Sequence, residues 1–439
     1  MTFPWTSTPV GWTIVALFAV AYALVVAEER LDLRKSKPVL FAAGLIWALV
    51  AWQALRTGSS QEDVRLLFRE AFADFAELFF FLIVAMSYVS AISERNVFEA
   101  MRAELVSRGL GYRALFWWTG GLAFFLSAVL DNLTTALIMA SVVLAVAREN
   151  RRFVAVACVN LVVAANAGGA WCAFGDITTL MVWQAHRAEF FDFFTLFVPS
   201  LVNFVVPALL MHPFVPKGRP PPGTDDADIK PGGLGVCALF GVTIALTVAA
   251  KQLLGLPPVF GMMFGLGLLN LFAWWIGRLE RVRATEPPVH GRGYSIFRII
   301  ALAEWDTLLF FYGVLLCVGG MATAGYMALW SGSLYGALGP TGANIALGLA
   351  SAIVDNIPIM YAVLRMNPAM DLSQWLLITL TTGVGGSLLS VGSAAGVALM
   401  GAARGHYTFM SHLRWSWAIA LGYGASVLTH LWLSSAGQG

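Results

Sequence analysis

Charged residues are scarce in this chain. Only 12% of its 439 residues are Asp, Glu, Lys or Arg, whereas 59% are hydrophobic, and a soluble globular domain carries about 25% charged residues. One water-soluble core cannot bury this much apolar surface, so a lipid bilayer must be the solvent. The net charge of +2 is too small to indicate a nucleic-acid partner.

Cysteine is also rare, and its four positions exclude two kinds of site. All four lie in apolar stretches without the CxxC spacing of a metal or redox motif, at Cys158, Cys172, Cys237 and Cys317. They are typical of small buried hydrophobic residues, not of a disulfide framework.

Most of the sequence consists of apolar runs that are long enough to span a bilayer, which takes about 20 residues. Two further apolar stretches, 113–147 and 340–366, are each interrupted near the middle by Asp-Asn, which predicts re-entrant helical hairpins. Two of the long runs contain Gly-rich polar interruptions, which predicts helices unwound near the midplane, where only protein or a wet cavity can cover irregular backbone. The expected spans are 10–27, 39–55, 72–92, 154–183, 192–212, 233–250, 257–277, 303–325, 371–404 and 414–433.

The distribution of Lys and Arg predicts the orientation of these spans. With both termini outside and both hairpins not crossing, the inside loops hold 21 of the 27 basic residues and the outside loops hold six. The asymmetry favours ten crossings in a cell membrane, and we expect the bacterial inner (cytoplasmic) membrane.

The chain also repeats itself. S-A-V-L-D-N from Ser127 recurs as S-A-I-V-D-N from Ser351, and each copy precedes one Gly-Gly interruption. The loop count puts the two hairpins on opposite sides, so the sequence predicts an all-α polytopic membrane protein with inverted-topology repeats, each with a re-entrant helical hairpin and a broken transmembrane helix. The expected division is N-terminal helices over 1–70, a first repeat over 71–212, a Pro-rich loop over 213–232 and a second repeat over 233–439.

Polar residues at the two hairpin tips are candidate ion ligands. Asp131, Asn132 and Thr134 lie at the first tip, and Asp355 and Asn356 lie at the second. A carboxylate at membrane depth is costly and therefore indicates function, and such oxygen ligands suit a hard cation. The alternative is helix capping, which Asp and Asn perform equally well, and both roles can hold together.

A serine precedes each of these acids by four residues. On a helix, Ser127 and Ser351 would share the face of Asp131 and Asp355, respectively. Each is either a ligand or support for one, or a hydroxyl that bonds back to its own helix.

The Gly-rich interruptions supply a second candidate group. The first contains Asn166, Asp176, Thr178 and Thr179, and the second contains Ser387 and Ser390 but no acid. Flexible glycine packing between helices accounts for the glycines but leaves Asp176 unexplained. By contrast, we interpret Asp74, Glu77, Glu304 and Asp306 as acids near helix starts, where the helix dipole favours them.

Four motifs together resemble the NhaD-type sodium/proton antiporters of the ion transporter superfamily, over about residues 70–433. They are L-S-A-V-L-D-N-L-T-T-A-L-I-M, A-A-N-A-G-G-A-W-C-A-F-G-D-I-T-T-L-M, E-W-D-T-L-L-F-F-Y-G-V and G-G-S-L-L-S-V-G-S-A-A-G-V-A-L-M-G. The resemblance implies efflux of Na⁺ or Li⁺ against H⁺ entry, a homodimer and elevator-like motion. It also points to Ser127, Asp131, Asn132, Asn166, Asp176, Thr178, Thr179, Ser351, Asn356, Ser387 and Ser390. One departure is visible, since Cys172 and Ala173 stand where the family usually has Ser-Pro.

We therefore expect exchange by competition, with Na⁺ at Asp131, Asn132, Asn166 and Asp176. Burial raises the pKa of a carboxylate and a bound cation lowers it, so cation binding would expel protons. No cofactor is expected. The chief alternative is a permease for an anion such as arsenite or a dicarboxylate, but neither hairpin's apolar run, over 114–147 and 340–364, contains Lys or Arg. A membrane enzyme would need a nucleophile or metal cluster, and none is apparent.

Overall fold

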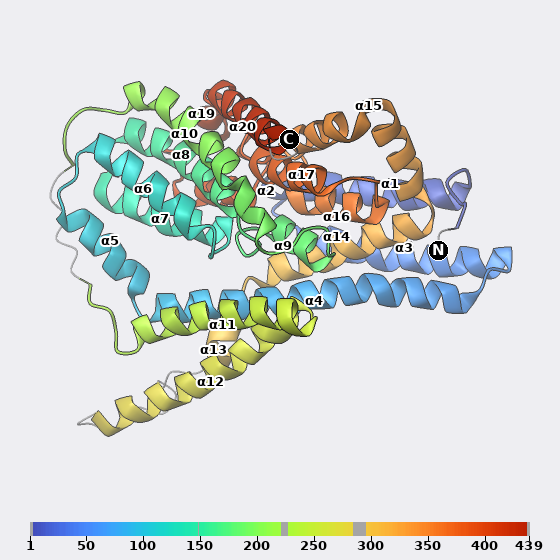
Figure 1. The fold of residues 1–439 in the computed structure, drawn as a ribbon, viewed down its shortest axis with the longest axis horizontal. Coiled ribbons are helices and arrows are strands. Elements are labelled where there is room, and N and C mark those ends of the chain that lie inside the picture. The colour runs from blue at the N-terminus through green and yellow to red at the C-terminus, as the bar shows by residue number, and fades with distance from the viewer. Residues whose placement is uncertain (1–2, 148, 221–226, 284–295, 437–439) are drawn as a thin grey trace. The chain divides into compact units, whose positions relative to one another are not determined.

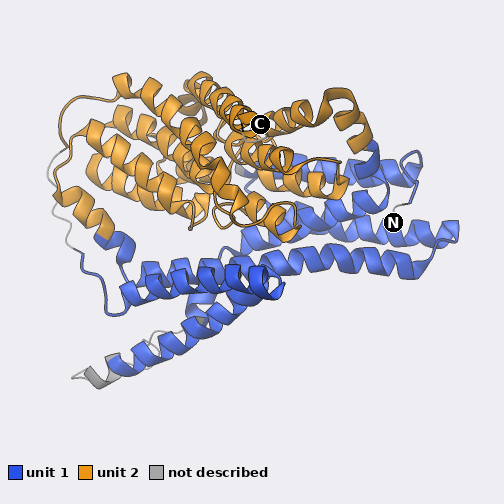
Figure 2. Cartoon of the chain, viewed as in Figure 1, with its two compact units in different colours: residues 1–100, 227–329 blue, residues 101–226, 330–439 orange. Residues whose placement is uncertain are grey.

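The protein is helical throughout the part that the structure describes. That structure is a computed structural model, and it describes residues 3–147, 149–220, 227–283 and 296–436. Figure 1 shows that every regular element in those residues is a helix, as the sequence predicted. The chain forms two compact units: residues 1–100 with 227–329, and residues 101–226 with 330–439 (Figure 2).

The first unit contains the N-terminal helices and a group from the middle of the chain. Helices α5 (Val97–Ser107) and α15 (Tyr326–Ala350) connect it to the second unit. Its own helices are α1 (Pro9–Val26), α2 (Glu28–Leu31), α3 (Ser36–Thr57), α4 (Gln61–Glu94), α11 (Gly233–Leu254), α12 (Pro258–Arg283), α13 (Ile296–Ala301) and α14 (Trp305–Thr323).

Helices α3 and α14 pack closely in this unit. Small residues allow backbones to approach in a membrane protein, and a Cβ atom added at Gly320 would lie 2.4 Å from Ile46 Cγ2. The indole Nε1 of Trp47 donates a hydrogen bond to Leu316 O over 2.9 Å. The pair therefore combines close packing with a buried polar contact.

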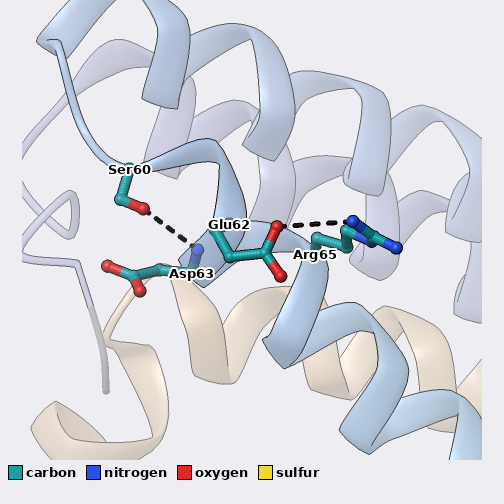
Figure 3. Close-up of polar contacts among 4 residues, drawn as sticks. All are labelled: Ser60, Glu62, Asp63 and Arg65. Carbon is teal, nitrogen blue, oxygen red and sulfur yellow. Dashed lines mark hydrogen bonds and ion pairs between the residues drawn. The ribbon is translucent and has the colours of Figure 1, made fainter.

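Helix α4 begins earlier than its apolar run, which corrects one interpretation made above. Ser60 caps it, with Oγ accepting from the amide of Asp63 over 3.3 Å, and Glu62 lies in the first turn (Figure 3). Asp74 and Glu77 consequently lie several turns inside the helix, so the dipole at its start cannot account for them. The interpretation holds for Glu304 and Asp306, which are the N-cap and a first-turn residue of α14.

The second unit contains both Asp-Asn pairs. Short helices alternate here with irregular connections at 127–131, 170–176, 351–355 and 386–393. Its elements are α6 (Tyr112–Leu126), α7 (Asn132–Ala147), α8 (Arg151–Gly169), α9 (Ile177–Gln184), the 3-10 helix η1 (Asp192–Leu196), α10 (Phe197–Met211), η2 (His212–Phe214), α16 (Asn356–Met366), α17 (Leu372–Gly385), α18 (Ala394–Ala402), α19 (Phe409–Leu413) and α20 (Ser416–Ala436).

One local arrangement occurs twice in the second unit. The Oγ atom of Ser127 donates to Ala165 O over 2.6 Å, and that of Ser351 donates to Thr382 O over 2.8 Å. Each serine thereby ties the turn before an Asp-Asn pair to the last turns of an interrupted helix. Neither serine bonds back to its own helix, which was the alternative for these residues.

Glycines let the same elements approach closely in both places. A Cβ atom added at Gly168 would lie 2.1 Å from Phe124 O, and one added at Gly385 would lie 2.0 Å from Gly348 O. No real Cβ contact is this short, so both positions require glycine for close approach.

Eight helices in the described residues are long and apolar enough to cross a membrane, which confirms a polytopic membrane protein. All eight fall on apolar runs that the sequence predicted as spans, whereas the predicted spans 371–404 and 414–433 are not among them. The eight helices are Pro9–Val26, Ser36–Thr57, Gln61–Glu94, Arg151–Gly169, Asp192–Phe214, Gly233–Leu254, Pro258–Leu279 and Trp305–Thr323.

Candidate functional site

The carboxylate of Asp131 caps helix α7. Its Oδ1 atom accepts from the amide of Thr134 over 2.8 Å, and its Oδ2 atom accepts from the hydroxyl of Thr134 over 2.6 Å. Asp131 is half-buried at the turn between α6 and α7. The structure thus contains the capping contacts expected as one of the two roles for this residue.

Asp176 caps helix α9 in the first interrupted helix. Its Oδ1 atom accepts from the amide of Ile177 over 2.6 Å, and its Oδ2 atom accepts from the hydroxyl of Thr178 over 3.1 Å. Thr179 completes a capping box with the backbone of Asp176. The residue is only 6% exposed, so its carboxylate depends on these donors instead of water.

Asn356 connects this carboxylate to the second Asp-Asn pair. Its Nδ2 atom donates to Asp176 Oδ2 over 2.8 Å, although the two residues lie 180 positions apart in the chain. Asn356 begins helix α16, directly after Asp355. The second Asp-Asn pair therefore contributes a direct contact to the acid of the first interrupted helix.

The two acids of the Asp-Asn pairs differ in their capping contacts. Asp355 is the N-cap residue of α16 but makes no side-chain capping hydrogen bond there, whereas Asp131 holds Thr134 with both oxygens. The two sites are therefore not equivalent, despite their similar sequences.

A chain of amides joins the first tip to the second interrupted helix. Asn132 Nδ2 donates to Asn166 Oδ1 over 3.0 Å, and Asn166 Nδ2 donates to Ser387 Oγ over 2.8 Å. Asn166 and Ser387 are both fully buried. Residues that lie up to 221 positions apart in the chain thus form one hydrogen-bonded chain.

Helix α18 begins in the second interruption just as α9 begins in the first. Ser393 is its N-cap, and its Oγ accepts from the amide of Gly396 over 3.3 Å. The backbone angles of Ser393, φ −141° and ψ 148°, nearly equal those of Asp176, φ −143° and ψ 154°. A hydroxyl in the second copy therefore occupies the position that a carboxylate occupies in the first.

The predicted residues make several separate contacts in the second unit. Asp131 bonds to Thr134, and Ser127 and Ser351 bond to backbone carbonyls. Ser390 donates to the sulfur of Met400 over 3.4 Å. Thr179 bonds to the backbone of Asp176 through its hydroxyl and to the side chain of Asp176 through its amide. Two hydrogen-bonded groups of the second unit together are called the polar cluster: Asn132 with Asn166 and Ser387, and Asp176 with Thr178 and Asn356.

Sequence reasoning missed His412. Its Nε2 atom lies 2.8 Å from Ser387 O, so it contacts the same residue as Asn166. No spacing or motif indicates this contact, because only the fold brings α19 to the interruption between α17 and α18.

The donor set defines what the cluster can bind. Carboxylate, amide and hydroxyl oxygens are the ligands that hard cations prefer, and the ends of interrupted helices offer further carbonyls. A chain that combines many apolar spans with such a buried polar cluster belongs to the class of polytopic membrane transporters.

Comparison with known proteins identifies the family within that class. A family model described as citrate transporter (CitMHS) matches residues 3–383. The chain is 50% identical to the Na(+)/H(+) antiporter NhaD of Alkalimonas amylolytica, over 98% of this chain and 92% of that protein. It is 51% identical to the protein of the same name from Halomonas elongata, over 98% and 90%. The chain belongs to this NhaD family of antiporters, within the wider citrate transporter family, as its motifs indicated.

A plant relative extends the similarity. Sodium/proton antiporter 1 of Arabidopsis thaliana is 32% identical over 97% of this chain and 73% of that protein. The relatives are transporters and not enzymes, in agreement with the expectation from sequence.

Proposed function

We propose that this protein exchanges Na⁺ or Li⁺ for H⁺ across the membrane. The observation that carries the proposal is the buried carboxylate of Asp176, which interrupts a helix and accepts hydrogen bonds from Ile177, Thr178 and Asn356. A cation or a proton would compete with these donors for the carboxylate oxygens. The names of the bacterial relatives support the exchange of Na⁺ for H⁺.

Coupling follows from competition for the same oxygens. A carboxylate in a dry site holds either a proton or a cation, because an unpaired charge is costly there. Asp131 and Asp176 are the two acids that we assign to this exchange, with Asp355 as a third. Asn132, Asn166 and the hydroxyls of Thr134 and Ser387 would complete the cage.

The transport framework is also part of the proposal. We infer inverted-topology repeats with re-entrant hairpins, supported by the matched serine contacts of Ser127 and Ser351 and by the asymmetry of basic loops. We further infer a homodimer in the inner membrane of a bacterium, with both termini outside. Alternation of a site between two membrane faces requires such a framework.

Proton flux in everted membrane vesicles tests the proposal. Addition of Na⁺ or Li⁺ should collapse an imposed proton gradient, as a pH-sensitive dye reports, and K⁺ serves as a comparison. An Asp131→Asn, Asp176→Asn double variant should retain its folded yield and lose the response. Normal sodium-driven flux in that well-folded variant would contradict the assignment.

Anion transport is a second candidate, because the matching family model is described as citrate transporter. An anion site should offer cationic side chains, but residues 114–147 and 340–364 contain no Lys or Arg. Uptake of radiolabelled citrate by proteoliposomes should therefore stay at the level of empty liposomes. Saturable citrate uptake would favour this second function.

A further inference from the structure

His412 is buried in a connection that lies outside the eight apolar spans. It belongs to the short helix α19, between α18 and α20, and its side chain is fully buried. Its Nε2 atom lies 2.8 Å from Ser387 O, and its Nδ1 atom lies 2.7 Å from Tyr407 Oη. Thr408 and Ser411 form a capping box that orders this short helix.

The partners of the imidazole determine its protonation. A carbonyl oxygen can only accept, so Nε2 must carry the hydrogen, and the hydroxyl of Tyr407 then donates to Nδ1. Burial lowers the pKa of His412 to about 4, and burial raises the pKa of Tyr407 well above its usual value. His412 is therefore a neutral donor to Ser387 at physiological pH.

The carbonyl that His412 binds is freed by the helix interruption. Helix α17 ends at Gly385 and α18 begins only at Ala394, so carbonyls between them lack the helical amide four residues on. Ser416 Oγ donates to the next such carbonyl, Leu388 O, over 2.6 Å. Two consecutive carbonyls of the interruption are thus held by the segment 412–416.

Ser387 links this support to the polar cluster. While its carbonyl accepts from His412, its hydroxyl accepts from Asn166 over 2.8 Å, and Asn166 in turn accepts from Asn132 over 3.0 Å. A continuous hydrogen-bonded chain therefore runs from Tyr407 to the first Asp-Asn pair. All its members belong to the second compact unit.

We propose that His412 is a positioning residue, which holds Ser387 so that Asn166 keeps its orientation toward the cation cage. The proposal rests on the cation exchange proposed above, and it assigns His412 no contact with the transported ion. Loss of the contact between His412 and Ser387 would loosen the interruption between α17 and α18 and misalign Asn166. The misalignment would weaken cation binding more than it would slow turnover.

Three variants test this role. His412→Leu removes both hydrogen bonds, and His412→Gln keeps an N–H donor at the reach of Nε2. His430→Leu is the matched control, because His430 is also largely buried and its Nε2 lies 3.0 Å from a backbone carbonyl, Ser373 O, at the start of α17. The readouts are the Na⁺ concentration for half-maximal proton flux and the maximal flux per folded protein.

We expect His412→Leu to raise the half-maximal Na⁺ concentration roughly three- to tenfold, the equivalent of one hydrogen bond, with little change in maximal flux. His412→Gln should restore most of the affinity, and His430→Leu should leave it unchanged. An unchanged Na⁺ concentration in His412→Leu would overturn the proposal. Equal losses in His412→Leu and His430→Leu would also overturn it, since they indicate general destabilisation.

Hydrogen exchange separates this proposal from the proposed function. The amides of Ser387 and Leu388 bond to Val384 O and Gly385 O, and they should exchange faster in His412→Leu than in His430→Leu. If the unmodified protein shows no sodium-driven flux, the proposed function is wrong. Exchange that stays equal in the two variants instead refutes the positioning role alone.

Discussion

At the scale of single residues, helix capping is observed in the same carboxylates to which we assign ion exchange. Asp131 and Asp176 each satisfy amides at a helix start, a role that Asn fills nearly as well. Neither side chain is fully occupied by capping, because each oxygen of a carboxylate has two lone pairs. A cap that also carries charge is therefore a compact way to place an exchangeable acid beside irregular backbone.

Replacement of Asp131 by Asn separates the two roles. Asp371 is the matched control, because its Oδ1 accepts from the amide of Gln374 over 2.8 Å, the same distance as in Asp131, but it is exposed. Both variants should fold, since Asn preserves the cap. Dye-monitored proton flux should be lost in the Asp131→Asn variant and retained in the Asp371→Asn variant. Normal flux in Asp131→Asn would show that Asp131 acts only as a helix cap.

The buried imidazole of His412 predicts acid sensitivity. Its pKa is lowered from 6.5 to about 4 in the folded protein, so the unfolded chain binds a proton more readily between these values. The stability that the neutral form contributes is present above about pH 6.5 and is lost as the pH falls toward 4. In thermal unfolding in detergent, the unmodified protein should therefore lose stability more steeply below pH 6.5 than the His412→Gln variant. Equal dependence of stability on pH in the two proteins would contradict the assignment.

At the scale of elements, close backbone approach supports the polar cluster. Gly168 on α8 contacts Phe124 O, and Gly385 on α17 contacts Gly348 O. Ser127 and Ser351 bond across the same two pairs of elements. Packing and hydrogen bonding thus fix each interrupted helix against its neighbour.

Addition of a single methyl group should disturb these contacts. Gly168→Ala and Gly385→Ala would each force backbone apart, at a cost of about 1–3 kcal/mol. Gly121 and Gly401 are suitable controls, because a Cβ atom there meets nothing within 4 Å and alanine favours helix. Midpoints of thermal unfolding should fall in the first two variants and not in the controls; a fall of equal size in all four would point to a general effect of glycine loss.

The helical class and the polytopic character could be predicted because hydrophobic run length reports bilayer thickness directly. The start of α4 could not be predicted, since six of the eleven residues 61–71 are charged or polar and this segment lies outside the apolar run that marked the helix. A cap at Ser60 with acids in the first turn was the available signal. Residue type alone also indicated Asp131 and Asp176, because acids are rare in apolar segments.

Partners across long sequence separations were beyond prediction. Asn166 and Ser387 were both indicated as polar residues, but nothing in their local sequence specifies that they meet. His412 gave no signal at all, because its significance depends on a carbonyl freed in another segment. Such contacts arise from tertiary packing and leave no periodic pattern in the chain.

At the scale of the whole molecule, compact units and sequence repeats divide the chain differently. Each unit combines two separate stretches, 1–100 with 227–329 and 101–226 with 330–439. The predicted repeats instead run over 71–212 and 233–439, so each repeat contributes to both units. All residues of the polar cluster belong to the second unit.

The membrane orientation can be tested by cysteine labelling. In a variant without the four native cysteines, Ser59→Cys lies in a connection expected outside, and Ser107→Cys lies in a basic segment expected inside. An impermeant maleimide added to intact cells should label the first position, and the second only after permeabilisation. The reverse pattern would invert the proposed topology.

The shared backbone position of Asp176 and Ser393 has a consequence for the energetics of a transport cycle. The two similar helix starts have one ionisable cap, Asp176, and one neutral cap, Ser393. The type of residue at position 393 therefore decides whether this pair of caps can carry one proton or two. Each elementary charge moved across the membrane responds to its voltage, by about 2.3 kcal/mol per 100 mV. An acid at position 393 would give the protein another group that could carry a proton, and so could change how strongly the membrane potential drives it.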